Sequence, residues 1–241
     1  MEFIADPHVH TIVSGDAHST VFEYILVARE IGLKYICFTE HVNIIPRAIK
    51  PEFLKRTRSI PRSYMDVNLI RGVEVNIIDY EGKVDVPDSD MEWLDWVIAS
   101  MHDVALPAGS VKDHTETWMK IAENPLIDCI GHCGNPRYDF DHKPVIKAFR
   151  DGGKIVEINN HSFSAKGRQG SYENCRDIAS LCAEYGVPIV CSSDAHFVNN
   201  LGNFRDAVAM LEEIDFPEEL VLNADELRFK TMIESKMNTK D

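Results

Sequence analysis

Short runs of apolar and β-branched residues recur along the chain, a pattern typical of buried β-strands. They predict strands over residues 3–9, 35–39, 68–75, 96–100, 128–131, 154–158 and 188–191. Longer amphipathic segments between them predict helices over 21–31, 115–123, 143–151 and 172–185, with further helices at 204–214 and 225–237. Glycines in REIGLKY, FRDGGKI and AEYGVPI mark the ends of three of these helices.

The alternation of strands and helices is typical of parallel βαβ units. Seven strands are more than a small flavodoxin-like sheet holds and one fewer than an eight-stranded barrel needs. The segment EVNIIDYEGKVDV predicts an added hairpin that turns at Glu81 and Gly82. Residues 1–241 show no internal repeat, low-complexity segment or linker, so we expect an α/β fold of one domain.

The composition is that of a globular protein with a sizeable core, with 44% hydrophobic and 27% charged residues. The formal net charge of −14 argues against nucleic acid as a partner, because a polyanion would be repelled. The sequence shows no apolar run of membrane-spanning length and no secretion signal at its N-terminus. We therefore expect a cytoplasmic protein with no membrane partner, whose six cysteines are reduced thiols.

Polar residues gather at the carboxyl ends of the predicted strands. Because these ends meet on one face of a parallel α/β barrel, the side chains are expected to lie on one rim. His8 and His10 are two positions apart, the spacing that places both rings on one face of a strand. The other candidates at strand ends are His41, Glu74, His102, His132, Asp194 and His196.

Imidazole and carboxylate groups together suit Zn²⁺, Mn²⁺ or Fe²⁺, whereas Mg²⁺ and Ca²⁺ prefer oxygen ligands alone. A single tetrahedral ion takes three or four ligands, so this larger set indicates two or three ions that share a carboxylate. Ions about 3.5–4 Å apart can hold a hydroxide and clamp the oxygens of an in-line displacement. The pattern favours a metal-dependent phosphoesterase with a small phosphorylated substrate and zinc as the first choice of ion.

The order of the motifs resembles the PHP family, named for polymerase and histidinol phosphatase. The matching segments are DPHVHT, TEH, GVEVN, SMHD, GHCGNP and SSDAH, between Asp6 and His196. GHCGNP, EINN and NFRDA are most similar to the small stand-alone bacterial PHP phosphatases with a trinuclear metal site. The resemblance implies a distorted (β/α)7 TIM-like barrel with its metal site at the C-terminal rim of the strands. The motifs would occupy residues 6–196, and helices over 204–237 would complete the barrel surface.

The resemblance also implies three metal positions, and a homo-oligomer such as a trimer follows from family likeness alone. The ligand sets would be His8, His10, Glu74 and Asp194; Glu74 as a bridge with His102 and His132; and His41, His196 and one residue of the loop SGDAHS. Family members usually place a histidine in this loop. Asp16 fills that slot here, and His18 is the alternative two positions later. Glu40 points away from its neighbour His41 in a strand, so we expect it to support the ligands from outside.

A hydroxide held by the metals is the expected nucleophile, and Asp194 or His196 is the candidate for proton transfer to the leaving group. Lys166 and Arg168 lie in a glycine-flanked loop after the sixth strand and are candidates for binding the substrate phosphate. An arginine fork in particular suits a phosphate. His114 and His142 begin helical patterns and are expected at the surface.

Two other functions stay open. A phosphodiesterase or nuclease could use the same site, although the acidic charge disfavours it. A non-catalytic metal-binding regulatory protein would be expected to lack ligands, and only the choice between Asp16 and His18 is ambiguous. An amidohydrolase-type barrel would normally use a bridging lysine on the fourth strand, and VIASMHDV contains none.

Overall fold

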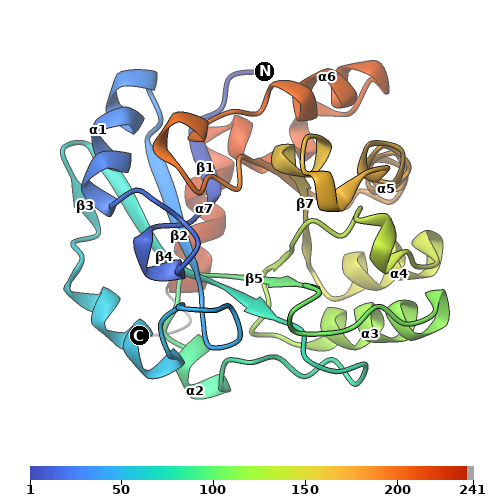
Figure 1. Cartoon of the computed structure of the whole chain (residues 1–241). Coiled ribbons are helices and arrows are strands. Elements are labelled where there is room, and N and C mark those ends of the chain that lie inside the picture. The colour runs from blue at the N-terminus through green and yellow to red at the C-terminus, as the bar shows by residue number, and fades with distance from the viewer. Residues whose placement is uncertain (238–241) are drawn as a thin grey trace.

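The computed structural model describes residues 1–237, and its strands form one twisted sheet that nearly closes on itself (Figure 1). Seven strands lie parallel in the order β1-β2-β4-β5-β6-β7-β8. A parallel bridge between Val9 and Ala195 connects β1 to the segment that follows β8. This arrangement confirms the predicted distorted (β/α)7 barrel.

The parallel strands are short and match the predicted ones to within a few residues. They are β1 (Ala5–Val9), β2 (Tyr35–His41), β4 (Val67–Asn76), β5 (Trp96–Ser100), β6 (Cys129–Ile130), β7 (Ile155–Asn159) and β8 (Ile189–Ser192). Between β1 and β2 the pairing register shifts between Asp6 and Val9, which marks a bulge or irregularity in β1. Such an irregularity re-aims the side chains that follow it.

Helices lie outside the sheet, and Figure 1 shows α3, α4 and α5 in sequence along one side of the barrel. The α-helices are α1 (Val21–Ile31), α2 (Asp88–Met91), α3 (Val111–Glu123), α4 (His142–Asp151), α5 (Ser171–Tyr185), α6 (Arg205–Glu213) and α7 (Glu226–Met237). Thr20 and Glu23 cap the start of α1 reciprocally, and Gly32 ends it with φ 82°. A similar capping box between Ser110 and Asp113 starts α3 earlier than the predicted position 115.

The connection from β2 to β4 is irregular. It contains a 3-10 helix, η2 (Pro51–Ser59), and then the short strand β3 (Ser63–Tyr64), which pairs antiparallel with β4. Met65 and Asp66 form the turn of this hairpin with positive φ values, and the sequence pattern did not predict it. The hairpin predicted after β4 is present, because an antiparallel bridge joins Ile77 to Val84.

The interior of the barrel is apolar at its amino-terminal end. Side chains of the strands fill it together with residues of α7, namely Ala5, Tyr35, Cys37, Ile70, Trp96, Ile98, Cys129, Ile155, Val190, Phe229 and Ile233. The ring of Phe229 contacts Tyr35 edge-on at 5.4 Å between centroids. Trp96 satisfies its buried indole N–H by donating to the carbonyl of Pro7 at 3.0 Å.

The described helices and the cysteines agree with the expectations of no membrane span and of reduced thiols. Within residues 1–237, none of the helices combines the length and the apolar character that a membrane span requires. All six cysteines are buried and free, which agrees with the prediction of reduced thiols.

Candidate metal centre

The predicted ligands meet at the carboxyl ends of the strands, above the apolar base of the barrel. His8 lies within β1, His41 ends β2 and Glu74 lies near the end of β4. The others lie one to four residues beyond strand ends, at His10, His102, His132, Asp194 and His196. The structure therefore brings the residues predicted from strand ends into one cluster.

The first group of side chains comprises His8, His10 and Asp194, all of them buried. The Nε2 atoms of the two histidines lie 2.9 Å apart. Asp194 Oδ1 lies 3.6 Å from Nε2 of His8 and 3.3 Å from Nε2 of His10. One ligand atom from each residue falls within 4.8 Å of the others, so the group could hold a single ion.

The second group comprises Glu74, His102 and His132. Glu74 Oε1 lies 2.9 Å from Nε2 of His132 and 3.5 Å from Nε2 of His102. The other oxygen of Glu74, Oε2, lies 3.3 Å from Nε2 of His8 in the first group. The two oxygens of one buried carboxylate thus face two groups, which is the geometry of a bridging ligand.

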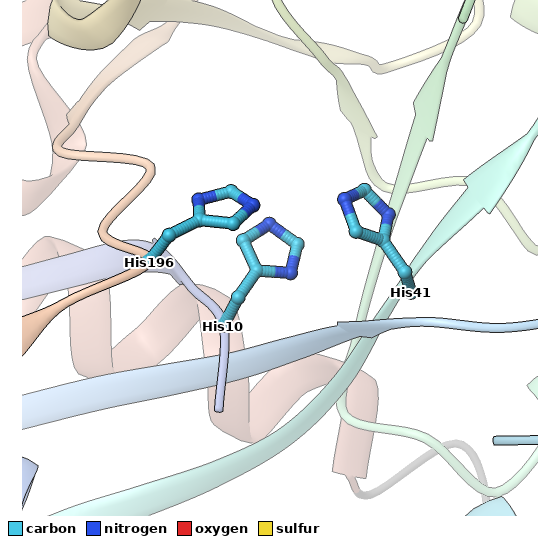
Figure 2. Close-up of side chains that lie close together, drawn as sticks. All are labelled: His10, His41 and His196. Carbon is cyan, nitrogen blue, oxygen red and sulfur yellow. The ribbon is translucent and has the colours of Figure 1, made fainter. Parts of the chain in front are cut away.

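The third group is built around His41 and His196. Figure 2 shows their rings together with that of His10, whose centroid lies 4.2 Å from His41 and 4.4 Å from His196. Asp16 Oδ2 lies 3.7 Å from Nε2 of His41 and 3.5 Å from Nε2 of His196. His18 is exposed, and its backbone N–H donates to the carbonyl of His196. The geometry favours Asp16 as the loop residue of this group.

Hydrogen bonds fix the tautomers of His8 and His196. Nδ1 of His8 lies 2.5 Å from Glu157 Oε1, and an ionised carboxylate only accepts hydrogen bonds. Nδ1 of His196 lies 3.0 Å from the backbone carbonyl oxygen of Asp194, which also only accepts. Nδ1 therefore carries the proton in each neutral ring, and the Nε2 lone pair is left to coordinate a metal ion.

His10 and His102 are anchored in the same way. Nδ1 of His10 lies 3.1 Å from Ser14 Oγ, whose hydroxyl donates to Glu40 Oε2 at 2.6 Å. Nδ1 of His102 lies 2.8 Å from Asn76 Oδ1. Glu40 thus supports the centre from outside, as the sequence predicted.

Three of the histidines and both carboxylates have protonation states that suit metal binding. Burial and neighbouring positive charge lower the pKa of His10 to about 4, and the pKa values of His41 and His102 to about 3. Burial alone would raise the pKa values of Glu74 and Asp194, but the charge of His8 and other nearby cations holds both well below their usual range. Neutral imidazoles and ionised carboxylates are the forms that bind divalent metals.

Against the effect of burial, Glu157 and Glu74 raise the pKa of His8, and Asp16 and Asp194 raise the pKa of His196 to about 9. Metal binding at these two rings would therefore release a proton.

An unpaired nitrogen atom of His41 also indicates that the donor atoms suit divalent ions. Among residues 1–237, Nδ1 of His41 is buried without a hydrogen-bond partner, although it lies 3.1 Å from Glu74 Oε2. A buried polar atom left unpaired costs about 1–3 kcal/mol, and a cation between these two groups would remove that cost. The residues present therefore fit a cluster of metal ions.

Backbone strain accompanies two of the candidate ligands. His132 and Asp194 have φ values of 25° and 53°, in the left-handed region that residues other than glycine rarely adopt. Gly131 lets β6 approach β5, because a Cβ there would lie 2.1 Å from Ser100 Oγ. Strain of this kind concentrates at functional sites, where surrounding structure holds it in place.

Six of the candidate ligands line a cleft of about 330 Å³, together with Ile45, Met101, Tyr138 and Arg168. The six are Asp16, His41, Glu74, His102, Asp194 and His196. Arg168 Nη1 donates to Asp194 Oδ2 at 3.3 Å and to Ser162 Oγ at 3.1 Å. Its guanidinium therefore lies beside the candidate metal ligands. Lys166 is exposed and is not among the residues that line the cleft.

Sequence reasoning missed Glu157 and Asn76 as partners of the candidate ligands. Glu157 is buried in β7, where it also accepts from the backbone N–H of His132 at 2.6 Å and from Ser192 Oγ at 2.6 Å. A carboxylate flanked by apolar residues inside the predicted strand 154–158 was the signal that could have identified it. Asn76 ends β4, and its sequence neighbourhood carries no comparable signal.

The chain is similar in sequence to a known protein family and to proteins named as phosphatases. The PHP domain model matches residues 6–161. A protein of Clostridium novyi named as a probable phosphatase is 38% identical over 241 residues, covering 100% of this chain and 98% of its own. Another probable phosphatase, from Caldicellulosiruptor saccharolyticus, is 43% identical over 218 residues, and the match covers 90% of each chain.

A solved structure shares the fold. Histidinol phosphate phosphatase from Lactococcus lactis, determined with zinc, L-histidinol and phosphate, superposes with a TM-score of 0.64. The sequences are 17% identical, and the match covers 88% of this chain and 94% of the other.

Proposed function

The chain belongs to the PHP domain family and is a phosphatase of that family. We propose that it hydrolyses a small phosphomonoester at a cluster of two or three divalent metal ions. The observation that carries this proposal is the convergence of histidine Nε2 atoms and carboxylate oxygens on one rim of the barrel. Imidazole with carboxylate favours zinc, with manganese or iron as alternatives.

The proposed ligands divide into three sets around the shared carboxylate of Glu74. One set is His8, His10, Asp194 and Glu74; the second is Glu74, His102 and His132; the third is His41, His196 and Asp16. In this assignment Asp16 takes the position for which His18 is the alternative, since its carboxylate faces both histidines of the third set.

Divalent ions bound here would supply an activated water molecule and offset the negative charge of the phosphoryl group. Arg168 would bind a phosphoryl oxygen, for which its position beside Asp194 is suited. Asp194 and His196 both line the cleft, and we assign to one of them the transfer of a proton to the leaving oxygen. His196 would donate the proton it carries, whereas the ionised Asp194 would first take up the proton released by the activated water molecule. Lys166 would assist from the exposed side of the same loop.

A monoester is favoured over a nucleic acid by charge and size. The chain carries 39 acidic and 25 basic residues, which disfavours a long polyanion. A cleft of about 330 Å³ suits a small metabolite.

The test is hydrolysis of p-nitrophenyl phosphate before and after exhaustive chelation. We expect activity to disappear with the metal and to return on addition of Zn²⁺ or Mn²⁺. Parallel assays with bis-p-nitrophenyl phosphate and single-stranded DNA should show slower turnover than the monoester. Full activity in a demonstrably metal-free sample would contradict the metal-dependent proposal, and faster turnover of the diester or of DNA would favour a phosphodiesterase.

A further inference from the structure

The anchor of His102 differs in kind from the carboxylate and the carbonyl oxygen that hold His8 and His196. Carboxylate and carbonyl oxygens only accept, so they can hold only the Nδ1–H form of an imidazole. The side-chain amide of Asn76 has an accepting oxygen at one end and a donating NH₂ group at the other. Its orientation therefore decides whether His102 keeps a lone pair or a proton on the Nε2 atom that faces Glu74.

Asp85 sets that orientation. Its Oδ2 accepts from Nδ2 of Asn76 at 2.7 Å, and its Oδ1 accepts from the backbone N–H of Asn76 at 2.8 Å. A flipped amide would turn its oxygen against the carboxylate, where two acceptors would repel each other. Asn76 Oδ1 must therefore face His102, so His102 donates from Nδ1 and leaves Nε2 unprotonated.

Asp85 lies outside the cleft, in the hairpin segment that returns along the end of β4. Its own backbone N–H donates to the carbonyl of Asn76 at 3.0 Å, so the two residues are held together by three hydrogen bonds. Burial raises the pKa of the Asp85 carboxyl to about 6 even though Asn76 donates to it, so it is ionised at neutral pH. Burial of a carboxylate is energetically unfavourable. Orientation of Asn76 is a functional reason for placing one here.

We propose that Asp85 is a positioning residue that fixes the tautomer of His102 and thereby the affinity of the metal position formed by Glu74, His102 and His132. The inference rests on the proposed function for its metal. The chain of contacts from Asp85 to His102 can be tested without any metal.

The first test is Asp85→Asn, with Asp88→Asn as the matched control because Asp88 is exposed at the start of α2 in the same segment. Long-range ¹H–¹⁵N spectra of the metal-free protein distinguish the two imidazole tautomers, and the His102→Gln variant assigns the signal. We expect the Nδ1–H form in the wild type and in Asp88→Asn, and a shift toward the Nε2–H form in Asp85→Asn. Zinc competition with a chromogenic chelator should show about 10–100-fold weaker binding at one position only.

The second test exchanges the two polar groups, as Asn76→Asp combined with Asp85→Asn. The new carboxylate at 76 can only accept from His102, and the new amide at 85 can donate to it while accepting from the backbone N–H. We expect the Nδ1–H tautomer and the lost zinc affinity to return. This variant also covers the case in which the single variant does not fold.

The inference is overturned if folded Asp85→Asn keeps the wild-type tautomer and zinc affinity, or if the exchanged pair leaves His102 in the Nε2–H form. A wild-type protein that binds no zinc would contradict the proposed function instead. The tautomers measured without metal would still decide the role of Asp85.

Discussion

The two ends of the barrel interior are built from the same strands but from opposite chemistry. At the amino-terminal end, residues such as Tyr35, Trp96 and Phe229 fill the space with apolar side chains. At the carboxyl end, the same strands lead into buried histidines and carboxylates such as His8 and Glu74. Apolar burial stabilises the fold, whereas buried ionisable groups are costly unless they are paired. The base therefore holds the barrel together, and the rim is available for chemistry.

The largest expected effect at the rim is that of Glu74→Gln. The amide keeps the shape of the carboxylate but removes the charge that faces two sets of ligands. We expect phosphatase activity to fall by about 10³-fold and the bound metal to decrease. Activity assays and metal analysis of the purified protein measure both effects. Glu92→Gln, at an exposed position, is the control and should behave as wild type. Near-normal activity in Glu74→Gln would contradict the shared role of Glu74.

The largest expected effect at the base is that of Phe229→Ala. Removing this fully buried ring from α7 should lower the free energy of unfolding by about 3–5 kcal/mol, measured by urea denaturation. Leu227→Ala, in the same helix with its side chain 74% exposed, should change it by less than about 0.5 kcal/mol. Below the unfolding transition, Phe229→Ala should retain its metal and activity. Equal stabilities of the two variants, or selective loss of metal in Phe229→Ala, would contradict the separate roles of the two ends of the barrel.

A smaller effect is expected for Arg168→Ala, because Arg168 acts on the substrate rather than on the metal cluster. Loss of a charge-assisted hydrogen bond costs about 1.5–3 kcal/mol, so KM should rise about tenfold or more while metal content stays constant. Arg205→Ala, an exposed arginine on α6, is the control. Lys166→Ala should have a weaker effect than Arg168→Ala because Lys166 lies outside the cleft lining. An unchanged KM in Arg168→Ala would remove this residue from the substrate site.

The strand-end residues of the rim could be predicted from the sequence because one rule of parallel barrels places them together. His8 and His10 were identified from their spacing, although the irregular register of β1 was not predicted. The location of the protein and its oligomeric state stay predictions.

The supporting contacts could not be predicted, because they join residues far apart in the chain. Glu157 contacts His8 across 149 positions, and no local pattern encodes that pairing. The environment of His114 could not be predicted either, because the expectation of a surface histidine was wrong. Its ring is buried, its Nδ1 lies 2.8 Å from the carbonyl of Asp139 and its Nε2 accepts from the backbone of Gly109 at 2.9 Å. Tertiary packing at the start of α3 decides its environment.

The most direct test of the central claim is anomalous diffraction at the zinc edge from crystals of the zinc-loaded protein. We predict two or three peaks within coordination distance of the rim groups, with one pair bridged by Glu74 and one peak beside Asp16. Well-occupied zinc sites elsewhere with no peak among His8, His102 and His196 would contradict the account.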